Sequence, residues 1–356
     1  MSEVDIPLID VTALFGPAGA ARDEVDAAIM RAASGSGFMT VTARPELIPA
    51  TAAERARLLR VFGLPETQTR RLWRRKFAEE NPNVYRGWFP VQPGHLTAKE
   101  GIDLGGDVAH GPGLIVGDDP LREATPLPAE PSLPGWRAAV AAYYRDMERI
   151  SAALMRAIAR GLGLEEHHFD AAFTQGLSTL RLIRYPRRSA AELAAAADAG
   201  VWVRHASERR QLTGAPHVDS GFLTLLAQDG VPGLQARHVL GDWIDVPPLE
   251  GALVVNFGKV LERWCAGRIR ATEHRVLGGD RERRSIPFFY EARAEAEIAP
   301  LPFADAATFE PFLYGDYLWA TTTQFVEFHG MAALRPPRRV TASLSRPSEP
   351  SSRPPV

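Results

Sequence analysis

Seven short apolar segments between residues 180 and 290 constrain the fold more than any other feature of this sequence. Several alternate between apolar and polar residues, and turn-forming residues separate them, as is typical of β-strands. Short strands that follow one another without intervening helices favour an antiparallel sandwich or jelly roll over a parallel sheet. The predicted strands are 180–185, 222–226, 234–238, 243–246, 252–256, 274–276 and 285–290.

A long helix is predicted over residues 136–161. Its apolar side chains recur at helical spacing and therefore share one face. A face of this size needs a large sheet to cover it, so we expect this helix to be part of the scaffold. The residues of the face are Val140, Tyr143, Tyr144, Met147, Ile150, Leu154 and Ile158.

The rest of the sequence shows weaker periodicity of its apolar residues. Residues 81–135 are rich in Gly and Pro with little periodicity, which predicts a mostly ordered loop. From residue 336 onward Pro, Ser, Thr and Arg dominate, which predicts a disordered tail. Further strands are predicted over 6–10 and 38–42, and further helices over 21–33, 46–60, 67–75, 189–197 and 314–328.

Composition excludes several classes of protein. Lys and Arg number 41 and Asp and Glu 43 among 356 residues, so no excess of cations exists to neutralise a nucleic acid. The single cysteine, Cys265, allows no intrachain disulfide and no thiolate metal cluster, and we expect it to be inert core. We find no secretory signal and no apolar run long enough for a membrane span, so we expect a cytoplasmic protein.

Two histidines and one aspartate form the candidate metal site. His217 and Asp219 are two residues apart in an extended segment, so their side chains face the same side. His274 lies on another predicted strand and is suited to supply a third ligand. Two His and one carboxylate on one face of the ion are typical of non-haem Fe(II) oxygenases, in which three coordination positions stay open.

A candidate anion site follows nine residues later. Arg283 and Ser285 share one face of a predicted strand, whereas Arg284 points to the other. An arginine held inside a sheet keeps its charge and needs a partner. The carboxylate of a small molecule would satisfy Arg283 bidentately, and the Ser285 hydroxyl would add another donor.

These motifs together resemble the iron- and 2-oxoglutarate-dependent dioxygenases of the isopenicillin N synthase-like family, over residues 5–331. The resemblance implies a mainly β fold with flanking helices, in which a double-stranded β-helix (a distorted jelly roll) carries an N-terminal helical region. The expected organisation is an N-terminal α/β region over 1–125, a catalytic domain over 126–331 and a disordered tail over 332–356. Further motifs that carry the resemblance are Ile6-Pro-Leu-Ile-Asp10, Lys99-Glu-Gly-Ile-Asp-Leu-Gly105, Thr224-Leu-Leu-Ala-Gln-Asp229, Gly233-Leu-Gln235, Gly251-Ala-Leu-Val-Val-Asn256 and Tyr314-Gly-Asp-Tyr-Leu318.

The resemblance also implies roles for individual residues. His217, Asp219 and His274 would bind Fe(II). Arg283 and Ser285, with help from Tyr185, would hold the distal carboxylate of 2-oxoglutarate, while Fe(II) chelates its other end. The implied reaction consumes O₂, releases succinate and CO₂, and hydroxylates, desaturates or cyclises a small molecule.

Two positions depart from the family's pattern. Ile183 stands where plant members frequently have Asn, which removes a polar contact near the co-substrate. Lys259 stands where the family usually has Asp, and the sequence offers no physical account of that change of charge.

An alternative function stays open. Oxidases of the isopenicillin N synthase type share the fold and the Arg-x-Ser motif but do not use 2-oxoglutarate, and stoichiometric succinate release would discriminate between the two.

The substrate side is less determined. The connection 187–216 carries Trp202, Arg209 and Arg210, and is either a lid over the site or a surface excursion. As a lid it would favour a polar or anionic substrate. The aromatic residues of 83–89 are candidates for the wall of the pocket.

Overall fold

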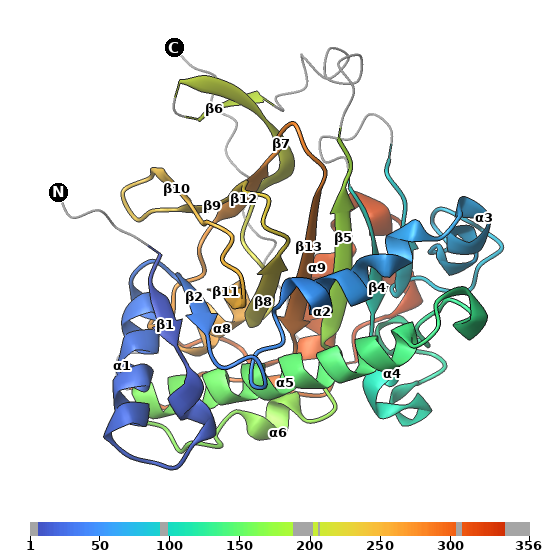
Figure 1. Cartoon of the computed structure of the whole chain (residues 1–356). Coiled ribbons are helices and arrows are strands. Elements are labelled where there is room, and N and C mark those ends of the chain that lie inside the picture. Colours follow the sequence, from blue (N-terminus) through green and yellow to red (C-terminus); the bar gives the residue numbers. More distant parts are fainter. Residues whose placement is uncertain (1–5, 93–98, 188–201, 206, 304–307, 339–356) are drawn as a thin grey trace, which may run out of the picture.

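The computed structural model describes residues 6–92, 99–187, 202–205, 207–303 and 308–338. Its core is a pair of curled sheets (Figure 1), and apart from the parallel pair β1–β2 their neighbouring strands run antiparallel. This arrangement confirms the predicted jelly roll.

The larger sheet has eight strands. In spatial order they are β1 (Leu8–Asp10), β2 (Phe38–Thr42), β11 (Ala252–Phe257), β8 (Leu223–Gln228), β13 (Arg283–Tyr290), β5 (Thr179–Tyr185), β4 (Glu100–Leu104) and β3 (Gly87–Phe89).

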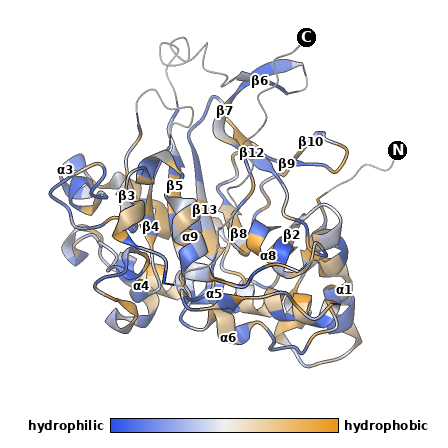
Figure 2. Ribbon diagram, turned by 180° about the vertical axis from the view of Figure 1, so that it is seen from behind, coloured by the Kyte–Doolittle hydropathy of each residue, from blue (hydrophilic) through white to orange (hydrophobic). Residues whose placement is uncertain are grey.

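The smaller sheet has five strands. In spatial order they are β10 (Trp243–Asp245), β9 (Leu234–Arg237), β12 (His274–Leu277), β7 (Glu208–His217) and β6 (Trp202–His205). A separate two-stranded pair joins β14 (Glu297–Ile298) to β15 (Phe312–Leu313). β6 and the adjoining end of β7 are coloured hydrophilic and extend away from the body of the molecule (Figure 2).

The scaffold helix is α5 (Trp136–Gly161), with the bounds that the sequence predicts. All seven residues of its predicted apolar face are at most 2% exposed, and they pack against the outer face of the larger sheet. Tyr144 illustrates the contact, because its ring meets Phe288 of β13 at 5.0 Å and its hydroxyl donates to the Ser178 carbonyl at 2.7 Å. Burial of this face determines the outer side of the sheet and leaves the inner side for the site.

The shorter helices agree with the prediction in place but less well in length. The helix predicted over 46–60 begins only at Ala52, because the Thr51 hydroxyl accepts a hydrogen bond from the Glu54 amide and caps the helix there. The described helices are α1 (Ala20–Ser34), α2 (Ala52–Leu59), α3 (Glu66–Thr69), α4 (Asp107–His110), α6 (Asp170–Phe173), α8 (Lys259–Trp264) and α9 (Tyr314–Thr322). The helix predicted over 189–197 lies outside the described residues.

The prediction that residues 81–135 form mostly loop is wrong for two segments. β3 and β4 pair with each other and with β5, and so extend the larger sheet. A Cβ atom on Gly101 would lie 2.3 Å from the Leu182 carbonyl oxygen, so this glycine allows close approach of two strands and does not mark a turn.

The connection predicted over 187–216 is not one irregular segment. Its second half is β7, which pairs with β12 and ends at His217, and β6 forms a hairpin with it. The alternation of β7 is hidden in the sequence because its first residues leave the core and are polar. The half of β7 that pairs with β12 belongs to the core sheet, whereas its first residues and β6 extend from the surface (Figure 2).

The ordered chain continues beyond residue 331. The Arg335 side chain is buried and forms ion pairs with Asp119 and Asp316 at 3.0 and 2.8 Å. Residues 339–356 lie outside the described part of the chain. No helix within the described ranges is long and apolar enough to cross a membrane.

Candidate metal and co-substrate site

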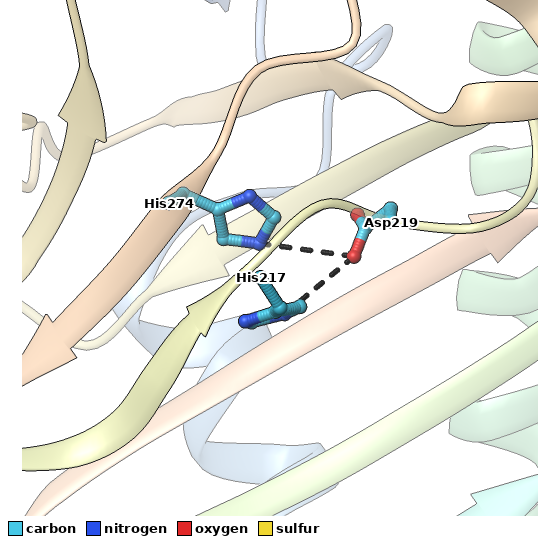
Figure 3. A group of neighbouring side chains, drawn as sticks. All are labelled: His217, Asp219 and His274. Carbon is cyan, nitrogen blue, oxygen red and sulfur yellow. Dashed lines mark ion pairs between the residues drawn. The ribbon is translucent and has the colours of Figure 1, made fainter. Parts of the chain in front are cut away.

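Three side chains meet between the two sheets (Figure 3). His217 ends β7, His274 begins β12 directly opposite it, and Asp219 follows in the loop that leads to β8. The Nε2 atoms of both histidines lie 3.7 Å from Asp219 Oδ1, and all three ligand atoms lie within 4.8 Å of one another. The structure therefore brings together the three residues that the sequence singled out for metal binding.

Hydrogen bonds orient both imidazoles. His217 Nδ1 lies 2.8 Å from the Ala215 carbonyl oxygen, and His274 Nδ1 lies 3.3 Å from that of Thr272. A carbonyl oxygen only accepts, so each Nδ1 carries the proton and each Nε2 presents its lone pair toward Asp219. The rings are 4.3 Å apart, and Phe38 packs edge-on against His274.

Two donors hold the Asp219 carboxylate from behind. The Thr224 hydroxyl and the Asn256 amide donate to Oδ2 at 2.6 and 2.8 Å, which leaves Oδ1 toward the histidines. The sequence analysis did not assign Thr224 or Asn256 to the site. Strand alternation could have indicated them, because both lie on the inner face of the larger sheet.

The loop that carries Asp219 is tied to helix α8. The Lys259 amide donates to the Asp219 carbonyl at 2.8 Å, and the Val260 amide donates to the Ser220 carbonyl at 3.2 Å. A Cβ atom on Gly258 would lie 2.3 Å from the Gly221 carbonyl oxygen, so only glycine permits this approach. The Lys259 side chain is exposed, so the departure from the family's acidic residue leaves the backbone contact intact.

The charges of the site suit a divalent cation. Burial raises the pKa of Asp219, but His274, His217 and the two hydrogen bonds outweigh it and lower the pKa below its usual range. Partial burial and the neighbouring His274 lower the pKa of His217 to about 4. At neutral pH Asp219 is thus a carboxylate and His217 a neutral imidazole, the forms that bind metal. One oxygen and two nitrogen donors on one side fit iron(II) and leave positions for a chelating co-substrate.

Arg283 lies buried on the inner face of β13 with few partners. Its Nη2 donates to Gln228 Oε1 at 3.3 Å, its Nε has no partner, and no carboxylate among the described residues pairs with it. Its guanidinium carbon lies 5.3 Å from the Tyr185 ring, and Ser285 is buried two residues along. Arg284 points outward and binds Glu282, as the alternation predicts.

A cavity of about 390 Å³ opens beside Arg283. Residues of β5, β6, β7, β12 and β13 line it. Its lining includes Tyr185, Trp202, Arg209, Arg210, Gln211, Thr213, Leu277, Arg281 and Arg283.

A buried acid below the metal site was not predicted. Glu291 is 7% exposed and accepts a hydrogen bond from the Tyr314 hydroxyl. Its carboxylate packs so closely against Gly221 that a Cβ atom there would lie 2.4 Å from its oxygens. Burial raises the pKa of Glu291 to about 8, against the effect of Tyr314, and the charge of Asp219 adds to the rise. Glu291 is therefore largely protonated at neutral pH and packs as a neutral group.

Comparison with known proteins agrees with this geometry. Residues 198–292 match the profile of the 2OG-Fe(II) oxygenase superfamily. Isopenicillin N synthase of Streptomyces clavuligerus is 30% identical over 94% of this chain and 97% of its own. The 2-oxoglutarate-Fe(II) type oxidoreductase hxnY of Emericella nidulans is 27% identical over 83% and 82%.

A solved structure is similar to this chain in its fold. A full-length Neurospora crassa protein, crystallised in complex with alpha-KG and 5-formyluracil, superposes with a TM-score of 0.69 at 26% identity, over 88% of this chain and 94% of its own. The double-stranded β-helix core of such oxygenases is the core described above.

We expect Thr224→Val to weaken metal binding about 10- to 100-fold, because Asp219 Oδ2 loses one of its two donors. Thr224→Ser keeps the hydroxyl and should bind nearly as the unmodified protein does. Calorimetric titration with Mn(II) under anaerobic conditions measures both. Equal affinity in Thr224→Val would contradict this role of the hydroxyl.

Glu291 should make stability depend on pH. The folded protein keeps a proton that the unfolded chain releases above its ordinary pKa of 4.5, so the contribution of Glu291 is full below pH 4.5 and is lost as the pH rises through about 8. Relative to Glu291→Gln, the free energy of unfolding should fall by roughly 1 kcal/mol per pH unit in this window. Urea unfolding at several pH values measures it, and exposed Glu165→Gln should leave the slope unchanged.

Proposed function

Because the chain belongs to the iron(II)- and 2-oxoglutarate-dependent oxygenases of the isopenicillin N synthase-like family, we propose that His217, Asp219 and His274 hold its iron. The observation that supports this most is that hydrogen bonds orient all three side chains. Each imidazole is tied through Nδ1 and the carboxylate through Oδ2, so the three remaining ligand atoms face one point.

The protein is an oxidoreductase that oxidises a small molecule and releases succinate and CO₂. When bound, iron(II) and 2-oxoglutarate supply the activation of O₂, a reaction that side chains alone do not perform. The chain's own residues supply the orientation of the ligands, which lie between the two sheets.

We propose that Arg283, Ser285 and Tyr185 hold the distal carboxylate of 2-oxoglutarate. A guanidinium that is 4% exposed and lacks an acidic partner in the described chain is stabilised by an anionic ligand. The Ser285 hydroxyl lies on the same face, and Tyr185 is the cross-strand neighbour of Arg283.

The alternative is an oxidase of the isopenicillin N synthase type that does not use 2-oxoglutarate. The 30% identity to a protein of that name is the observation in its favour. Equimolar succinate and oxidised product support the 2-oxoglutarate route, and product without succinate supports the alternative.

We propose a polar or anionic substrate. The cavity beside Arg283 is lined by Arg209, Arg210 and Arg281, and the positive charge of Lys99 also acts on His217. The 5-formyluracil bound by the similar Neurospora crassa protein is also small and polar. A net charge of −2 for the chain gives no support to a nucleic-acid substrate.

We expect His217→Ala, Asp219→Ala and His274→Ala each to abolish turnover, because two ligands do not retain the ion in an open site. Succinate release and Mn(II) titration measure the loss. His168→Ala removes an exposed histidine far along the chain from the site and is the control. Full turnover by any of the three variants would exclude that residue as a ligand.

Arg283→Ala should raise the 2-oxoglutarate requirement about 30- to 1000-fold, since a lost charge-assisted contact costs about 2–4 kcal/mol. Arg284→Ala, on the outer face of the same strand, should have little effect. Apparent 2-oxoglutarate affinity from succinate release measures both, and equal effects would contradict the assignment.

A further inference from the structure

A second arginine lies on the inner face of the larger sheet, away from Arg283. Arg181 of β5 pairs in register with Asp103 of β4. Its Nε and Nη2 donate to the two oxygens of Asp103 at 2.5 and 2.7 Å. This contact occupies one edge of the guanidinium and determines its orientation.

The charges around Asp103 do not balance. Arg74, which is 2% exposed, also pairs with Asp103, so two guanidinium groups share one carboxylate. Burial raises the pKa of Asp103, but Arg181 and Arg74 outweigh it and lower the pKa. Arg86 adds a further positive charge near Asp103. Glu327 is the weakest of the charges that act on the pKa of Arg74 and of Arg181. The cluster therefore keeps a positive charge.

The free edge of Arg181 faces open space. Its Nη1 has no hydrogen-bond partner among the described residues, and its side chain is 26% exposed although β5 lies inside the sheet. Phe89 and Phe289 flank the guanidinium, each with its ring centre 5.3 Å from Cζ. The open edge is thus a set of donors beside aromatic rings.

The same face of the sheet carries a contact of the metal site. Phe289 is partly exposed although β13 is a central strand of the sheet. Phe289 pairs with Thr224 of β8, whose hydroxyl binds Asp219. β8, β13 and β5 are adjacent (Figure 1), and Thr224 is in register with Phe289 and Thr179. Arg181 lies two residues farther along β5, so the Cα atoms of Arg181 and Thr224 are about 12 Å apart, from two strand spacings and two residues along a strand. A small molecule spans that distance.

We propose that Arg181 is the residue that recognises the substrate, and that it binds the carboxylate of a small aromatic acid. The residual positive charge selects an anion, the free Nη1 edge supplies in-plane donors to it, and Phe289 packs against the ring. The carboxylate thereby directs the rest of the molecule toward the iron ligands. This inference rests on the proposed function of the same site.

Benzoate is a suitable probe of this site, with benzamide as its uncharged match. Calorimetric titration in saturating 2-oxoglutarate should show benzoate binding to the unmodified protein, and much weaker benzamide binding. Arg181→Gln should lower benzoate affinity at least about tenfold while leaving apparent 2-oxoglutarate affinity unchanged. Asp103 keeps Arg74 as its partner in this variant, so the fold should be retained, and the thermal midpoint checks that.

Three further variants make the test specific. Arg184→Gln, on the outer face of β5, should bind benzoate normally. Arg181→Lys should recover part of the affinity, and Phe289→Leu should reduce it. Normal benzoate affinity in Arg181→Gln, or no benzoate binding to the unmodified protein, overturns the proposal.

The proposed function fails in a different way. Benzoate titrations are run with and without Mn(II), and Mn(II) binding is followed separately. Absent Mn(II) binding with normal benzoate binding would contradict the metal site and leave the role of Arg181 standing.

Discussion

The Asp219 carboxylate is the contact on which the geometry of the site depends. One oxygen accepts from Thr224 and Asn256 of the larger sheet, and the other faces His217 and His274 of the smaller sheet. A single charged group therefore links the two layers at the point where metal binds. Because its backbone is held by α8, the carboxylate has little freedom to turn away.

Burial of charge organises the rest of the inner surface. A guanidinium inside a protein keeps its charge, so each one requires an anion or a set of acceptors. Arg335 and Arg74 pair with acids of the chain itself, whereas Arg283 pairs with no acid among the described residues and donates to the Gln228 amide. Arg181 has its acid but keeps one edge open. Incomplete pairing thus distinguishes the two arginines that we propose as ligand-binding residues.

Much of the fold could be predicted because burial on one face leaves a periodic trace in the sequence. α5 has the predicted bounds, and the seven predicted strands between residues 180 and 290 are all present to within about two residues. β3 and β4 were missed because their glycines allow close approach of other parts of the chain, Gly101 to β5 and Gly87 to Leu72, and in a sequence such glycines look the same as those of a turn. β7 was missed because half of it extends beyond the core, where no alternation is needed.

The sequence by itself determined the three candidate metal ligands, which the structure brings together, and the face on which Arg283 and Ser285 lie, since both follow from residue type and a period of two. Only the tertiary structure decided which groups support them. Thr224, Asn256, Arg181 and Asp103 lie on four different strands, and Glu291 directly follows β13. Strand alternation predicts the face of each strand residue, but no local pattern predicts which of these side chains meet. Their contacts depend on strand register and sheet order, which arise from the packing of the whole chain.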